Sequence, residues 1–126
     1  MSEDKKRILV VEDNMIAAKT AQFILEKLGC TVECTDDGDK AVELMKAHHY
    51  DGICMDIGLP TLSGAQACIA IREHEAKNHL APVPIVAVTG NNSLEEAEQY
   101  IKAGMQDVIS KPLTKEKAEF FLSFCK

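Results

Sequence analysis

The chain has 126 residues, of which 46% are hydrophobic and 27% charged, a composition typical of one globular domain and not of a disordered chain. The formal net charge is -6 and no basic stripe is present, so direct binding to nucleic acid is not expected. No apolar stretch is long enough to cross a membrane, and no signal peptide is visible.

The cysteine count indicates the compartment. Five cysteines are present, an odd number, and no pair has the spacing of a zinc site. Cysteines in this pattern are typical of reduced thiols that serve as small apolar side chains in the cytosol. We therefore expect a single cytoplasmic domain over residues 1–126, with no membrane contact.

Five apolar segments with strand composition alternate with five amphipathic segments. The predicted strands cover residues 7–11, 31–35, 53–55, 84–88 and 107–110. The helices between and after them begin near residues 14, 40, 63, 93 and 114, and the third is expected to run to about residue 75. Such alternation predicts an α/β fold with a parallel sheet, right-handed crossovers and helices on both faces.

Polar and glycine residues mark the ends of these helices. Asn14 or Asp13 is expected to cap the first helix and Gly29 to end it, and Gly104 ends the fourth. Capping boxes are expected at Ser63 and Ser93, and a cap at Thr114. In the second helix, the core face is predicted to consist of Ala41, Leu44, Met45 and His48.

The third strand is central to the prediction because it is short, apolar and followed at once by Asp56. A carboxylate inside the core would be costly unless solvent, a cation or hydrogen bonds reach it. Asp56 is therefore expected at the open carboxyl end of the strand, which is the edge where open parallel sheets form their binding sites.

Three other strands also end in reactive polar residues, so these should meet Asp56 at one edge of the sheet. They are Glu12 and Asp13, Thr89, and Lys111. Three carboxylates repel one another unless a divalent cation binds, and oxygen ligands that must also admit phosphate favour Mg²⁺. An aspartate there can attack phosphorus, while the Thr89 hydroxyl and Lys111 stabilise the phosphoryl oxygens.

The complete set of motifs resembles the receiver domains of two-component response regulators over essentially the whole chain. The matching residues are Val10-Val11-Glu12-Asp13-Asn14, Met55-Asp56-Ile57-Gly58-Leu59-Pro60 with Gly64, Thr89, and Ser110-Lys111-Pro112. The resemblance implies a doubly wound, flavodoxin-like (βα)5 fold with strand order 2-1-3-4-5, and a cis peptide bond before Pro112.

The resemblance also implies a role for each residue of the site. Asp56 is expected to accept the phosphoryl group, with Thr89 and Lys111 contacting it. Asp13 and Asp56 are expected to ligate Mg²⁺, Glu12 to help hold the ion, and Gly58 to contribute its backbone carbonyl. A receiver of this kind is a monomer that catalyses its own phosphorylation and dephosphorylation.

The expected phosphodonor is a histidine kinase or a histidine phosphotransfer domain, and two settings for the chain remain open. Residues 104–113 resemble receivers attached to hybrid sensor kinases, which pass phosphate to a histidine phosphotransfer domain. The alternative is a stand-alone, single-domain response regulator. A remoter alternative is an Asp-nucleophile phosphatase, which would need a second acid where the chain has Gly58.

Two further features concern signalling. Val108 stands where the family usually has an aromatic residue, so the usual aromatic switch is not expected. Tyr100 could replace that residue, but helical periodicity does not aim the Tyr100 ring at the site.

At the start of the first helix, Met15, Ile16, Ala17 and Ala18 span more than one helix face. Some of them should therefore be exposed beside Asp56 for a partner helix.

Overall fold

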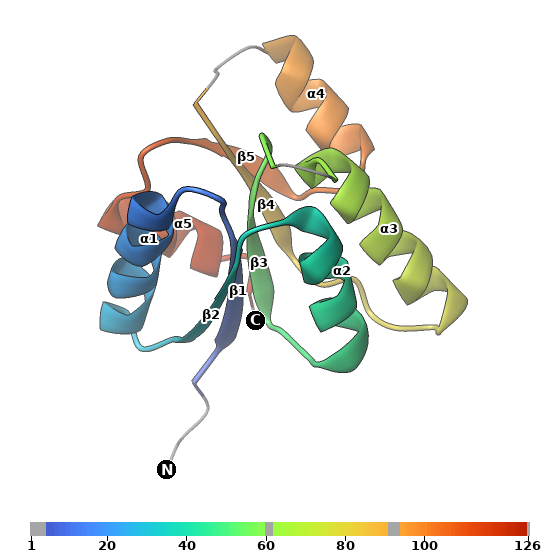
Figure 1. Ribbon diagram of the computed structural model, residues 1–126, viewed down its shortest axis with the longest axis horizontal. Helices are drawn as coiled ribbons and strands as arrows, with labels where there is room; N and C mark the ends of the chain where they lie inside the picture. Colours follow the sequence, from blue (N-terminus) through green and yellow to red (C-terminus); the bar gives the residue numbers. More distant parts are fainter. Residues whose placement is uncertain (1–4, 60–61, 91–93, 126) are drawn as a thin grey trace.

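The five strands form one parallel sheet (Figure 1). The computed structural model describes residues 5–59, 62–90 and 94–125. In sequence order the strands are β1 (Arg7–Val11), β2 (Thr31–Thr35), β3 (Gly52–Asp56), β4 (Ile85–Thr89) and β5 (Asp107–Ser110). Their spatial order is β2-β1-β3-β4-β5 and every neighbouring pair is parallel, which confirms the predicted fold class and strand order.

The helices cover both faces of the sheet. They are α1 (Met15–Lys27), α2 (Gly38–Ala47), α3 (Gly64–Lys77), α4 (Leu94–Lys102) and α5 (Lys115–Leu122). Helices α1 and α5 pack on one face, while α2, α3 and α4 lie on the other (Figure 1). No helix in the described part of the chain is long and apolar enough to cross a membrane.

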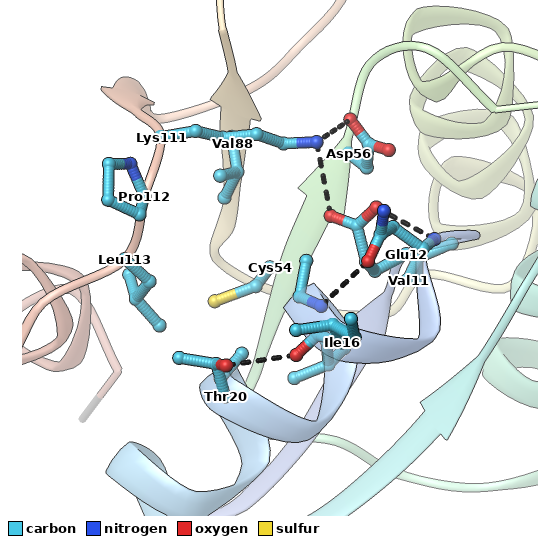
Figure 2. A pocket seen from close by; sticks show the side chains of 14 residues that line it. Val11, Glu12, Ile16, Thr20, Cys54, Asp56, Val88, Lys111, Pro112 and Leu113 are labelled. Carbon is cyan, nitrogen blue, oxygen red and sulfur yellow. Dashed lines mark hydrogen bonds and ion pairs between the residues drawn. The ribbon is translucent and has the colours of Figure 1, made fainter.

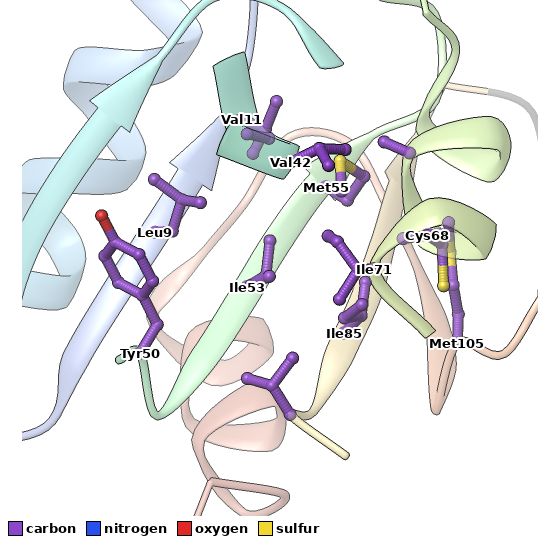
Figure 3. Close-up of a cluster of buried hydrophobic side chains, with 14 of the residues drawn as sticks. Leu9, Val11, Val42, Tyr50, Ile53, Met55, Cys68, Ile71, Ile85 and Met105 are labelled. Carbon is purple, nitrogen blue, oxygen red and sulfur yellow. The ribbon is translucent and has the colours of Figure 1, made fainter. Parts of the chain in front are cut away.

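Each face of the sheet has its own apolar core, which explains why the central strands β1, β3 and β4 are largely continuous apolar runs. Along β1, Ile8 and Val10 point to the α1/α5 side, where Leu25 and Phe121 are fully buried. Leu9 and Val11 point to the α2/α3 side, in the cluster that Figure 3 shows with Ile53, Met55 and Ile71. A strand covered on both faces needs apolar residues at every position rather than at alternate ones.

Most predicted helix ends are confirmed. The Asn14 Oδ1 atom accepts a hydrogen bond from the Ala17 N–H at 2.9 Å, Ser63 and Gln66 form the capping box, and the Thr114 hydroxyl accepts from the Lys117 N–H. Gly29 and Gly104 follow α1 and α4 with φ of 94° and 113°, values that favour glycine. The capping box expected at Ser93 lies outside the described residues.

Four details of the predicted elements are wrong. Helix α3 continues to Lys77, β3 runs from Gly52 to Asp56 instead of over residues 53–55, and β4 runs from Ile85 to Thr89 instead of over residues 84–88. His48 is not part of the core face of α2, because the helix ends at Ala47 and the backbone of His48 is extended. Val42 is buried in that face instead. Strand pairing and packing set these boundaries, and neither is visible in local periodicity.

Candidate functional site

The carboxyl ends of four strands bring the predicted polar residues together. Strand β1 leads into Glu12, β3 ends at Asp56, β4 ends at Thr89, and β5 leads into Lys111. The register makes this convergence unavoidable, since Val11 pairs with Met55, Asp56 with Val88, and Thr89 with Ser110. Glu12, Asp56 and Thr89 are all buried, with exposed fractions of 8%, 5% and 7%.

The three carboxylates form an oxygen-rich cluster. One oxygen each from Glu12, Asp13 and Asp56 lies within 4.8 Å of the others, and Asp13 is the exposed member. Hard oxygen ligands with one side open to solvent suit Mg²⁺, which keeps several of its waters. The donor set therefore fits the ion that the sequence predicts.

Lys111 bridges two of the acids (Figure 2). Its Nζ atom lies 3.2 Å from Asp56 Oδ1 and 3.3 Å from Glu12 Oε1. Partial burial lowers the pKa of Lys111, but the charges and hydrogen bonds of Asp56 and Glu12 outweigh this, so its pKa is raised above its ordinary value. The backbone holds the residue in place, because its N–H donates to the Thr89 carbonyl oxygen at 2.8 Å.

Glu12 is held from the other side by the start of α1. The Asn14 N–H donates to Glu12 Oε2 at 3.1 Å, and the Glu12 N–H donates to the Thr35 carbonyl oxygen. Burial and the neighbouring Asp56 carboxylate raise the pKa of Glu12 against the opposing effect of the Asn14 hydrogen bond. A cation bound at the cluster would lower the pKa of Glu12 instead, because positive charge favours the ionised carboxylate.

Two glycines lie against Asp56 at the end of β3. The Gly58 N–H donates to Asp56 Oδ1 at 3.3 Å. Gly64 opens α3 so close to the strand end that a Cβ atom there would lie 2.4 Å from the Asp56 carbonyl oxygen. Gly64 thus allows α3 to begin directly against the end of β3, which the sequence motif indicates but local propensity does not.

A wide hollow of about 760 Å³ lies over this site, and its lining corrects one expectation. Thr89, Gly58 and Lys111 line it as predicted, but so do Glu96 and Tyr100 of α4. The prediction that Tyr100 does not face the site is therefore wrong. Its ring is buried, its hydroxyl lies 3.4 Å from Glu96 Oε1, and burial together with Glu96 raises the pKa of the phenol.

The packing around Val108 explains why Tyr100 faces the site. Val108 and Tyr100 belong to the same core region, where Val108 is half-buried. A valine fills less space than an aromatic residue would, and the ring of Tyr100 packs in the same cluster from α4. Which face of a helix meets a site depends on how the helix is set against the sheet, and periodicity alone does not give that angle.

The beginning of α1 presents apolar side chains beside the acids. Met15 and Ile16 are strongly exposed, at 72% and 78%, whereas Ala17 and Ala18 are half-buried. The expectation that part of this segment is exposed is confirmed, and the exposed part is Met15 and Ile16.

The peptide bond between Lys111 and Pro112 is cis, as the resemblance implies.

Solved receiver domains share this fold. The receiver of the Pseudomonas aeruginosa sensor histidine kinase PA1611, which has a magnesium ion in its active-site cleft, is 34% identical with a TM-score of 0.84, covering 96% of this chain and 98% of that chain. The receiver of Saccharomyces cerevisiae Ssk1, crystallised with the histidine phosphotransfer protein Ypd1, is 29% identical with a TM-score of 0.90, covering 99% and 92%.

The family model for the response regulator receiver domain matches residues 8–119. The chain belongs to this family, and it is a receiver domain of two-component phosphorelay signalling. Curated relatives include transcription factor SKN7 of Saccharomyces cerevisiae (34% identity over 86% of this chain) and sensor histidine kinase GacS of Pseudomonas protegens (32% over 93%). The chain spans only 17% and 13% of those proteins.

Proposed function

We propose that Asp56 accepts a phosphoryl group from a phosphohistidine, with Mg²⁺ held by Asp13, Asp56, the Gly58 carbonyl and, less directly, Glu12. The observation that carries the proposal is the ammonium of Lys111 between the Asp56 and Glu12 carboxylates, next to Asp13 and Thr89. A structural ion pair would not need a third acid, a hydroxyl and an open hollow at the same point.

The chain's own residues account for each requirement of the transfer. An Asp56 carboxylate oxygen attacks phosphorus while the bond from phosphorus to the histidine nitrogen breaks, and that nitrogen keeps the electron pair. Lys111 and the Thr89 hydroxyl stabilise the phosphoryl oxygens as charge develops on them. Bound Mg²⁺ would supply further positive charge at these oxygens. The Gly58 N–H and the Lys111 ammonium both contact Asp56 Oδ1, and these contacts orient the carboxylate for attack.

The preferred setting is a phosphorelay in which the donor or acceptor is a histidine phosphotransfer domain, and the chain is the receiver of a hybrid sensor kinase. The Ssk1 receiver with Ypd1 and the kinase relatives support this setting. A stand-alone response regulator remains the alternative. We propose a cytoplasmic monomer covering residues 1–126 as one domain.

The remoter phosphatase alternative is weakened by Gly58. It contributes only backbone atoms, and its N–H already donates to Asp56. A second acid at this position would be needed to protonate the leaving group of a hydrolysed ester. Incubation with acetyl phosphate separates the two chemistries, since a receiver gains one lasting phosphoryl group and a phosphatase turns over many substrate molecules.

Reversible transfer tests the proposal. A histidine phosphotransfer protein carrying labelled phosphohistidine is mixed with the chain in Mg²⁺, and the label should move to the chain and return when unlabelled phosphotransfer protein is added. Transfer in one direction only would favour the stand-alone regulator. Transfer that is unaffected by EDTA would contradict the proposed role of the acid cluster.

A further inference from the structure

A second pocket opens beside the phosphorylation site, on the α1/α5 side of the sheet (Figure 2). Its volume is about 340 Å³. Val10, Cys54 and Val88 line it from the sheet, and Ala17 of α1 and Leu113 of the loop before α5 line it from the helix side. The walls are therefore largely apolar, unlike those of the hollow above Asp13 and Thr89.

The two cavities meet at the phosphorylation site itself. Glu12, Asn14, Asp56 and Lys111 line both of them. In Figure 2 the Lys111 side chain crosses the upper end of the apolar pocket, and its ammonium lies between Asp56 and Glu12. A small molecule can thus have one end among the phosphoryl-binding groups and the other among apolar side chains.

We propose that this pocket binds the apolar body of a small amphipathic phosphate or phosphonate, whose anionic head occupies the phosphoryl position near Lys111. The proposal rests on the function proposed above for the head-group end, and adds a separate binding site for the body. A cavity of about 150 Å³ is sufficient for a benzene ring, so a pocket of 340 Å³ admits a ring or a short branched chain.

The charges decide which head group fits. With Glu12, Asp13 and Asp56 against Lys111 alone, the cluster is negative and repels an anion. Mg²⁺ would reverse the balance, and the amino-terminal ends of α1 and α5, which follow Asn14 and Thr114, add positive potential on the same side. Binding of the amphipathic anion should therefore require Mg²⁺.

Two phosphonates that differ only in their apolar body test the proposal. Phenylphosphonate and methylphosphonate are titrated into the protein at saturating Mg²⁺ and followed by amide chemical shifts. Phenylphosphonate should bind at least about tenfold more tightly, because its ring leaves water for the pocket. Signals of Ala17, Ala21, Cys54 and Leu113 should move with the phenyl compound only.

Matched variants locate the ring. Ala17→Leu fills the pocket and should lower the affinity for phenylphosphonate to that for methylphosphonate. Ala18→Leu makes the same change at a residue outside the lining and should leave the affinity for phenylphosphonate unchanged. Thr20→Leu repeats the test from the next turn of α1 if Ala17→Leu does not fold.

Equal affinities for the two phosphonates, or a phenyl advantage that survives both Ala17→Leu and Thr20→Leu, would overturn the proposal. Mg²⁺-dependent binding of methylphosphonate would still support the phosphoryl site in that case. Absence of binding by both compounds would also overturn the pocket proposal, and the transfer experiment with phosphohistidine tests the head-group end independently.

Discussion

The ammonium of Lys111 lies 3.2 Å from Asp56 Oδ1, although the two residues are 55 positions apart in the chain. Strand β4 separates the two strands that carry them. The same ammonium is 3.3 Å from Glu12 Oε1 on the opposite side of β3. One cation thus joins the ends of β1, β3 and β5, so both the stability and the chemistry of this edge should depend on it.

Lys111→Met should lower the stability of the metal-free protein. Glu12 and Asp56 would lose their shared counter-charge while still buried, and a loss of about 1–2 kcal/mol is expected, since the Lys111 side chain is partly exposed. Urea unfolding in EDTA measures this. Mg²⁺ should restore more stability to the variant than to the native protein. Lys115→Met changes an exposed lysine of α5 as a control, and an equal loss there would contradict the account.

Asp13→Ala should remove most of the thermal stabilisation that Mg²⁺ gives. Asp13 is exposed and close to two buried acids, so in EDTA its removal should cost little or even stabilise by relieving repulsion. The difference in melting temperature with and without Mg²⁺ is the measurement, with Glu43→Ala on α2 as the control. If the Mg²⁺ response of Asp13→Ala stays at the native value, Asp13 is not a ligand.

Ile16→Glu should slow phosphotransfer from a histidine phosphotransfer protein at least about tenfold, the effect expected when a charge replaces an exposed apolar contact at an interface. Ile16 is 78% exposed at the start of α1, so the fold should be unaffected. Phosphorylation by acetyl phosphate should keep its native rate. Equal slowing with both donors would show that the substitution disturbs the site rather than a docking surface.

The phosphate mimic beryllofluoride should change amide signals near Thr89, Gly90, Glu96 and Tyr100. Negative charge at Asp56 acts on the Glu96 carboxylate across the shared hollow, and Tyr100 contacts Glu96. Lys111 and its neighbours should also change, because Lys111 pairs with Asp56. Val108 is stiff and has no ring to swing, so the rest of residues 107–122 should change little. Tyr100→Phe removes the hydroxyl and should reduce the change at Glu96. Large changes throughout residues 107–122 would show a switch that does not depend on an aromatic residue at position 108.

The sequence predicted the sheet and the polar set for a clear physical reason. Strands buried on both faces are continuous apolar runs, and in a parallel sheet all their carboxyl ends meet at one edge. Glu12, Asp56, Thr89 and Lys111 could therefore be placed together before any distance was known. The strand order came from the family resemblance alone, because local patterns do not specify which strands are neighbours.

Tyr100 and the apolar pocket could not be predicted in the same way. Both depend on how a helix lies against the sheet, since the angle of α4 brings Tyr100 to the hollow and the gap between α1 and Leu113 forms the pocket. Periodicity identifies the buried face of a helix but not its tilt. Predicting either would have required contacts between residues far apart in the chain.

The central claim is that Asp56 is the phosphoacceptor and that its reaction depends on the acid cluster. Intact mass after incubation with acetyl phosphate and Mg²⁺ tests this most directly, on the native chain, Asp56→Asn, and Asp39→Asn as an exposed-acid control. The native chain and the control should each gain one phosphoryl group, only when Mg²⁺ is present, and Asp56→Asn should gain none. Mg²⁺-dependent phosphorylation of Asp56→Asn would contradict the account.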